Sequence, residues 1–146
     1  MEAMSFSLEV LTLPVNDVDR ALRFYVDRLG FNLDVDYAPN DRFRVVQVTP
    51  VGSSCSIQFG KGLTDAHAGS IRNNYLVVRN LEGVRSLLLE RGVEVTEIRH
   101  KTPIGAWDGG FAPDVDPART DYASFADLTD PDGNRWVLQE RGYQSL

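Results

Sequence analysis

One segment of this chain occurs twice, and the duplication limits the folds that the sequence can adopt. Residues 15–31 run from Val-Asn-Asp-Val-Asp through an amphipathic stretch to Leu-Gly-Phe, and residues 78–93 run from Val-Arg-Asn-Leu-Glu through a similar stretch to Arg-Gly-Val. The alignment places Asp17 opposite Asn80. A repeat of about 63 residues in only two copies is too long for a solenoid and indicates two similar modules instead.

Hydrophobic spacing predicts the same order of elements, βαβββ, in both modules. Asp17 and Asn80 are the expected N-caps of two helices, and Gly30 and Gly92 are the expected residues just beyond their ends. The predicted helices cover residues 17–29 and 80–91, and the predicted strands cover residues 8–15, 32–37, 43–49, 55–59, 74–78, 94–100, 123–128 and 135–139. Residues 61–70 are expected to link the modules, and residues 101–121 form an unusually long loop that contains Trp107. Two similar modules that face one another are expected to create a cleft.

Composition narrows the classes of function. The 146 residues carry a net charge of −6, which argues against nucleic acid or an anionic membrane as a partner. The sequence shows neither an 18-residue apolar run nor a basic, apolar leader, so we expect no membrane span and no signal peptide. Cys55 is the only cysteine, which excludes an intrachain disulfide and fits a cytoplasmic location.

Several sequence pieces together resemble the vicinal oxygen chelate superfamily, which includes glyoxalase I, bleomycin-resistance proteins and extradiol dioxygenases. These pieces are residues 13–21, Phe24-Tyr25, residues 29–31 and the Asp-Pro-Asp-Gly-Asn-Arg motif at residues 130–135. The resemblance covers nearly the whole chain. It implies an α+β fold with two tandem βαβββ modules whose curved mixed sheets form a cleft. We therefore expect one glyoxalase-like domain, residues 1–146, with modules at 5–62 and 70–142.

The resemblance also implies where a divalent metal would bind. Catalytic members hold the ion with side chains on the first and last strands of each module, and the matching positions here are Val10, Ile57, Asn73 and Val137. Three of these four side chains are aliphatic and have no lone pair to offer a metal. A one-residue shift would bring in Glu9 or Gln58, which strand alternation is expected to turn to the opposite face. We therefore predict no metal site and no cofactor.

Without a metal, the former ligand positions are expected to form an apolar floor for a small organic molecule. The predicted ligand-binding residues share strand parity or lie near the pocket, and they are Val10, Thr12, Ile57, Phe59, Asn73, Tyr75, Trp107, Tyr122, Val137 and Gln139. The alternative is that these side chains only fill a closed core. Trp136 has the opposite parity and is expected to face the helix.

Two functions of different classes follow from the sequence. One is a metal-independent binding protein of the glyoxalase/bleomycin-resistance type. The other is a lyase, isomerase or dioxygenase that uses an unusual metal set or metal-free acid–base chemistry through His100 or Tyr75. The absent ligands favour the binding protein. We also expect a homodimer, because members of the superfamily often pair.

Overall fold

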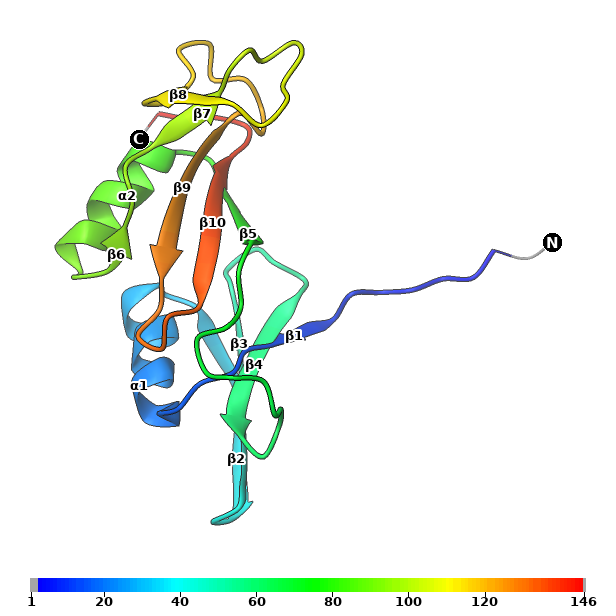
Figure 1. Ribbon diagram of the computed structural model, residues 1–146. Coiled ribbons are helices and arrows are strands. Elements are labelled where there is room, and N and C mark those ends of the chain that lie inside the picture. Colours follow the sequence, from blue (N-terminus) through cyan, green and yellow to red (C-terminus); the bar gives the residue numbers. More distant parts are fainter. Residues whose placement is uncertain (1–2, 146) are drawn as a thin grey trace. The chain divides into compact units, whose positions relative to one another are not determined.

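The computed structural model describes residues 3–145 of the chain (Figure 1). The chain divides into two compact units, and the boundary lies between Ser70 and Ile71. Each unit holds one mixed sheet, so the predicted α+β class with two mixed sheets is confirmed. No helix among residues 3–145 has the length and the apolar character that a membrane crossing needs.

Unit 1 is a four-stranded sheet with a helix against one face. Its elements are β1 (Val10–Thr12), α1 (Val18–Leu22), the π-helical continuation η1 (Arg23–Arg28), β2 (Asn32–Asn40), β3 (Phe43–Thr49) and β4 (Ser56–Lys61). The strand order is β1-β4-β3-β2. Strands β1 and β4 are parallel, and the other neighbours are antiparallel.

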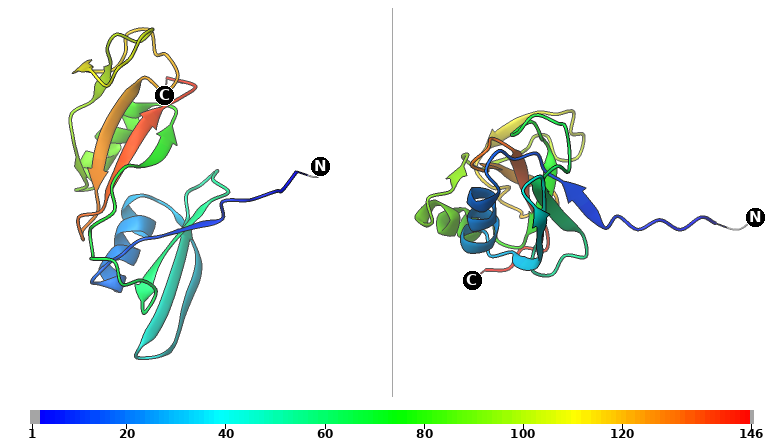
Figure 2. Two further views of the ribbon diagram at one scale, coloured as in Figure 1. Left: turned by 45° about the vertical axis from the view of Figure 1, so that its right-hand side comes forward. Right: turned by 90° about the horizontal axis from the view of Figure 1, so that it is seen from below.

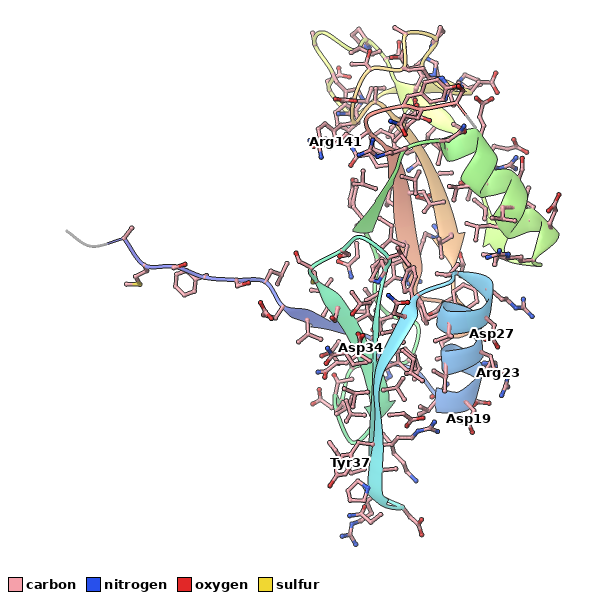
Figure 3. The ribbon with its side chains drawn as sticks, turned by 180° about the vertical axis from the view of Figure 1, so that it is seen from behind. Asp19, Arg23, Asp27, Asp34, Tyr37 and Arg141 are labelled. Atoms are coloured by element: carbon pink, nitrogen blue, oxygen red, sulfur yellow. The ribbon has the colours of Figure 1, made fainter. Side chains whose placement is uncertain are left out.

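The first helix forms where the sequence predicts it. The Asp17 side chain accepts a hydrogen bond from the Arg20 amide at 3.0 Å and caps the N-terminus. Gly30 has a φ of +76° just after the helix, a conformation that glycine adopts without strain. The helix buries the ring of Tyr25 against Phe59 of β4, with 5.6 Å between the ring centroids. Arg23 and Asp27 point away from the sheet, as Figure 3 shows.

Unit 2 has the same order of elements, except that one strand is divided in two and one short strand is added. Its elements are β5 (Asn74–Val78), α2 (Leu81–Glu90), β6 (Glu94–Val95), β7 (Arg99–Lys101), β8 (Phe111–Pro113), β9 (Ser124–Thr129) and β10 (Arg135–Glu140). The strand order is β5-β10-β9-β7-β8, and β6 also pairs with β9. Strands β5 and β10 are parallel. Figure 2 shows α2 on one side of this sheet.

The predicted strand 94–100 is wrong as one continuous element. It is divided into β6 and β7, which both pair with β9. The interruption lies at Thr96, whose hydroxyl accepts a hydrogen bond from the Asp127 amide at 2.9 Å. Because the side chain takes over one ladder hydrogen bond, the strand bulges before it rejoins β9 at Arg99.

The prediction that residues 101–121 form a loop without strands is also wrong. Residues 111–113 form β8, which pairs with β7 in a hairpin, with Lys101 opposite Phe111. The loop that remains between these strands covers residues 102–110.

The Asp130–Arg135 motif builds the turn before β10. Oδ1 of Asp130 accepts hydrogen bonds from the amides of Asp132, Gly133 and Asn134, each at 2.9 Å. The buried Asn134 side chain donates to Asp130 Oδ2 at 3.0 Å and accepts from the Ile71 amide at 3.1 Å. This motif therefore holds the β9–β10 turn to the start of unit 2, which is a structural role.

Candidate functional site

The sheet of unit 2 has one face covered by α2 and one face that no helix of this unit covers, here called the open face. Trp136, Leu138 and Leu128 are buried on the helix side with Leu81 and Leu88. Because side chains alternate along a strand, the sequence neighbours of these buried strand residues point to the open face. The open-face residues of neighbouring strands lie opposite one another in the sheet. They are Tyr75, Val77, Arg99, Phe125, Asp127, Val137 and Gln139.

Four aromatic rings form a cluster on the open face, here called the aromatic cluster. Phe125 of β9 lies at its centre, with ring centroids of Tyr75, Trp107 and Phe111 at 6.4, 6.4 and 5.9 Å. Trp107 is inclined 24° to the Phe125 ring, while Tyr75 and Phe111 meet it edge to face. Phe125 is only 4% exposed, but Tyr75 is 54%, Trp107 41% and Phe111 46% exposed. Exposed rings held on a buried ring form a preformed apolar surface.

Hydrogen bonds close the 102–110 loop and hold Trp107 beside the cluster. The indole Nε1 of Trp107 donates to the Gly110 carbonyl at 2.6 Å, and the Thr102 amide donates to the same carbonyl at 3.1 Å. A Cβ at Gly110 would lie 2.8 Å from the Thr102 carbonyl oxygen, so this close approach requires glycine. Gly109 has a φ of +102°, which other residues rarely adopt.

Two basic side chains of β7 extend over the aromatic cluster. The Arg99 guanidinium lies 4.9 Å from the Phe111 centroid and forms an ion pair with Asp127, with 3.2 Å between Nη2 and Oδ1. The Lys101 ammonium lies 4.7 Å from the Trp107 centroid and 5.7 Å from that of Phe125. All three cation-to-ring distances are in the range of cation–π attraction.

An open groove of about 690 Å³ adjoins the aromatic cluster at the edge of the sheet. Arg99 and Phe111 line the groove and also belong to the region of the cluster, and Asp127 of β9, the ion-pair partner of Arg99, lines the groove as well. The full lining is Thr96, Glu97, Ile98, Arg99, Phe111, Ala112, Pro113 and Asp127. The cluster and the groove together offer apolar surface with two acidic groups, Glu97 and Asp127, and two basic groups, Arg99 and Lys101.

In unit 1 the structure corrects the predicted floor residues. Thr12 of β1 pairs with Gln58 of β4, and Gln58 Nε2 donates to Thr12 Oγ1 at 2.8 Å. Val10 is paired with Ser56 on this same face. Ile57 and Phe59 alternate to the other side, where both are buried and Phe59 packs on Tyr25. The prediction that Ile57 and Phe59 share a face with Val10 and Thr12 is therefore wrong.

The cause is a one-residue error in matching the two modules. Thr12 lies five positions before its N-cap Asp17, as Tyr75 does before Asn80, and Tyr75 pairs with Val137. Because Thr12 pairs with Gln58, the unit 1 match of Val137 is Gln58 and not Ile57. The expectation that Gln58 turns away from Thr12 is wrong for the same reason.

The side chains at the family's metal positions do not fit a divalent ion. With the correction they are Val10, Gln58, Asn73 and Val137, which supply two amides and no carboxylate, imidazole or thiolate. The Gln58 amide is hydrogen bonded to Thr12. Within residues 3–145, no three His, Cys, Asp or Glu side chains gather closely enough to hold a metal.

The two catalytic candidates lie on opposite faces of the unit 2 sheet. Tyr75 is on the open face, whereas His100 alternates with Arg99 and Lys101 and is paired with the buried Ser124. His100 Nδ1 donates to the Asp114 carbonyl at 2.7 Å. One bound molecule on the open face therefore does not reach both residues.

The remaining candidates have mixed positions. Val137 and Gln139 lie on the open face, and Gln139 Nε2 donates to the Tyr122 carbonyl at 3.0 Å. Tyr122 and Asn73 are exposed residues with positive φ, at +66° and +63°, outside the strands. Their roles in binding stay predictions, as do those of Val10 and Thr12.

Sequence reasoning missed Phe125, Phe111, Arg99 and Lys101. Phe125 could have been predicted from the Asp130–Asn134 turn. A hairpin centred on this turn pairs Phe125 with Gln139, which was already a predicted site residue. Arg99, Lys101 and Phe111 depend on the bulge at Thr96 and on the β7–β8 hairpin, which leave no simple pattern in the sequence.

Comparisons with known proteins place the chain among glyoxalase-like folds. TnmS3, an antibiotic binding protein from Streptomyces sp. CB03234, has 28% identity and a TM-score of 0.73, with 95% of this chain and 99% of that chain covered. A glyoxalase/bleomycin resistance protein from the same organism has 28% identity and a TM-score of 0.67, with coverages of 91% and 99%. A superfamily member from Sphaerobacter thermophilus DSM 20745 has 24% identity and a TM-score of 0.71, with coverages of 95% and 100%, and shows the fold alone.

A search of curated proteins gave no match. The family model of the Glyoxalase/Bleomycin resistance protein/Dioxygenase superfamily matches residues 7–138, nearly the whole chain. The duplicated modules, the two mixed sheets and this match agree, and the chain belongs to the Glyoxalase/Bleomycin resistance protein/Dioxygenase superfamily.

Proposed function

We propose that this protein binds a flat aromatic small molecule on the open face of unit 2, without a divalent metal. The observation that carries the proposal is the aromatic cluster, in which Tyr75, Trp107 and Phe111 are each about half exposed around the buried Phe125. Large apolar side chains gathered on one face mark an interaction site more often than single exposed ones do.

The geometry of the cluster favours a planar ligand. Trp107 and Tyr75 present rings whose positions are fixed by Phe125 and by the Trp107–Gly110 hydrogen bond. A flat ring system that stacks on them buries apolar surface, worth about 25 cal/mol per Å², and loses little entropy because the rings are already ordered. Offset stacking adds about 0.5–1.5 kcal/mol per ring pair.

The comparisons support a binding role. TnmS3, which is 28% identical over 95% of this chain, is an antibiotic binding protein. Superfamily membership alone does not decide between binding and catalysis, because the fold hosts both. The side chains at the metal positions favour binding, since two valines and two amides do not make a site for a Lewis-acid metal.

Calorimetric titration with naphthalene-2-carboxamide, a neutral planar probe, tests the proposal. We expect binding that is unchanged by EDTA and that weakens about tenfold in Trp107→Ala and in Tyr75→Ala, because each removes one stacking surface. Leu89→Ala is the matched control, since Leu89 is 44% exposed on α2 away from the open face. Binding that requires added Ni²⁺ or Zn²⁺, or that is equally strong in all variants, would contradict the proposal.

We also propose that the protein is a homodimer, and residues before β1 support this. Met4, Phe6 and Leu8 alternate with polar residues in an extended segment and are 84%, 88% and 69% exposed. An extended segment with one apolar side suits pairing with a second copy of the chain. Light scattering should give the dimer mass for the full chain and the monomer mass after the triple change of Met4, Phe6 and Leu8 to Ser. A monomer in the unmodified chain would contradict the proposal.

A further inference from the structure

We infer that the aromatic ligand carries an anionic oxygen substituent, and that the Lys101 ammonium pairs with it. This inference rests on the proposed binding of an aromatic molecule to the open face of unit 2. It assigns a specificity-determining residue to that site and a charge to its ligand.

Lys101 is a basic group that lies over the aromatic cluster without an acidic partner. Its ammonium lies over the Trp107 and Phe125 rings, at 4.7 and 5.7 Å from their centroids. Among the ion pairs formed within residues 3–145, none includes Lys101, whereas the neighbouring Arg99 is paired with Asp127. The side chain is half-buried.

Ligand binding changes the solvation of the Lys101 ammonium. In the free protein, water and the ring faces solvate the charge. A flat ligand stacked on Trp107 excludes part of that water, and burial of a charge is unfavourable unless a partner replaces the lost hydrogen bonds. An anionic oxygen on the ligand supplies that partner with a charge-assisted hydrogen bond, while a cationic ligand leaves two like charges close together.

The net charge of −6 does not reverse this preference. Charges on the surface are screened over roughly 8 Å at physiological ionic strength, whereas the ammonium contacts the ligand directly. Lysine also suits ligands whose anionic group varies in position, because its flexible stem carries three donors.

The test compares three naphthalene probes by calorimetric titration: the 2-carboxylate, the 2-sulfonate and the neutral 2-carboxamide. For the unmodified protein we expect the carboxylate to bind about tenfold tighter than the carboxamide, the effect of one charge-assisted hydrogen bond. A similar gain for the sulfonate shows recognition of charge, and a gain for the carboxylate alone shows recognition of that group. Either result supports the inference.

Variants of the two lysines locate the effect. The sequence contains only Lys61 and Lys101, so Lys61→Met, which changes an exposed residue at the end of β4, is a matched control. Lys101→Met should abolish the preference, so that the carboxylate and the carboxamide bind the variant equally. Lys101→Arg should keep most of the preference, and Lys61→Met should leave it unchanged. Acetylation followed by mass spectrometry should show that bound naphthalene-2-carboxylate protects Lys101 and not Lys61.

The outcomes separate this inference from the proposed function. Equal binding of carboxylate and carboxamide to the unmodified protein, with both weakened by Trp107→Ala, overturns the inference and leaves the proposed function intact. A preference for the carboxylate that survives Lys101→Met also overturns the inference. Absence of binding by all three probes overturns both.

Discussion

Phe125 is the residue on which the candidate site depends, because it orders three exposed rings without being exposed itself. Its neighbours Tyr75, Trp107 and Phe111 come from β5, the 102–110 loop and β8, and each contacts the Phe125 ring.

Phe125→Leu keeps an apolar side chain at this position but removes the face on which Trp107 stacks. We expect about 1–1.5 kcal/mol lower stability in urea unfolding. Naphthalene-2-carboxamide should bind more weakly, although no ligand contact is deleted. Unchanged affinity would show that Trp107 is held by its loop alone.

Asp116 is a second residue whose environment makes a testable prediction. Hydrogen bonds from the Thr120 side chain, then from the Thr120 and Ala118 amides, lower the pKa of this buried carboxyl below its usual 3.8 and outweigh desolvation. A lowered folded-state pKa means that the carboxylate stabilises the fold above pH 3.8, and that this contribution is lost as pH falls from about 3.8 through the folded pKa.

Asp116→Asn should therefore lower the free energy of unfolding by about 2 kcal/mol at pH 7. The variant should also lose less stability than the unmodified protein between pH 5 and pH 2.5, two experimental endpoints about one unit or more either side of the usual aspartate pKa. Urea unfolding across this range measures both effects, with the exposed Asp65→Asn as the control. Parallel pH profiles for Asp116→Asn and the unmodified protein would contradict the assignment.

At the scale of elements, the start of α2 shows two interactions of different strength. Asn80 Oδ1 accepts the Gly83 amide at 2.8 Å, as the sequence predicts for an N-cap. The buried Glu140 of β10 accepts the Leu81 amide at 2.9 Å and forms an ion pair with Arg119 at 2.9 Å. Arg119 also pairs with Glu82 of α2. One carboxylate thus joins the helix, the sheet and the 114–123 segment.

Removal of Glu140 should cost more than removal of the cap. Asn80→Ala is expected to lower the free energy of unfolding by about 1 kcal/mol. Glu140→Ala should lower it by about 3 kcal/mol, because it leaves the largely buried Arg119 guanidinium with Glu82 as its remaining acidic partner. Chemical unfolding of both variants gives the comparison. A larger effect for Asn80→Ala would show that the ion pair contributes little.

The helices were easier to predict from the sequence than the faces of the strands. The helices follow from local signals, the caps Asp17 and Asn80 and the glycines after each helix, so their positions were predictable. Strand β5 and strand β3 were predicted with the observed bounds. The prediction of which β4 side chains share a face with Val10 and Thr12 was wrong. Alternation along a strand separates the side chains into two faces but does not tell which face is which, and Ile57 and Phe59 are as apolar as residues that line a pocket. The β1–β4 register, which is a long-range property, decides it.

For the site, the sequence predicted Tyr75, Trp107, Val137 and Gln139, and the structure places Tyr75, Val137 and Gln139 on one open face with Trp107 beside them. It missed the basic side chains of β7. The β7–β8 hairpin brings Lys101 opposite Phe111, and its loop holds Trp107 under the ammonium. Contacts of this kind depend on how a loop closes, which residue patterns do not encode.

At the scale of the whole molecule, we expect no tight binding of a divalent metal. The family's ligand positions hold Val10, Gln58, Asn73 and Val137, and hard divalent ions exchange their hydration for such a set unfavourably. Titration of EDTA-treated full-length protein with NiCl₂ or ZnCl₂ should show no stoichiometric site of micromolar affinity. A tight one-to-one site that is lost on Asn73→Ala would contradict this expectation.

The two tryptophans lie on opposite faces of the unit 2 sheet, so their signals distinguish binding to the open face from binding elsewhere in this unit. Trp107 lies at the aromatic cluster, and Trp136 is buried on the helix side of the same sheet. A ¹⁵N–¹H spectrum has one indole signal for each, which Trp107→Phe assigns. Titration with naphthalene-2-carboxamide in the presence of EDTA should shift the Trp107 signal to saturation and leave that of Trp136 almost unchanged. A shift of Trp136 alone, or no shift of either signal, would contradict a metal-independent aromatic site on the open face.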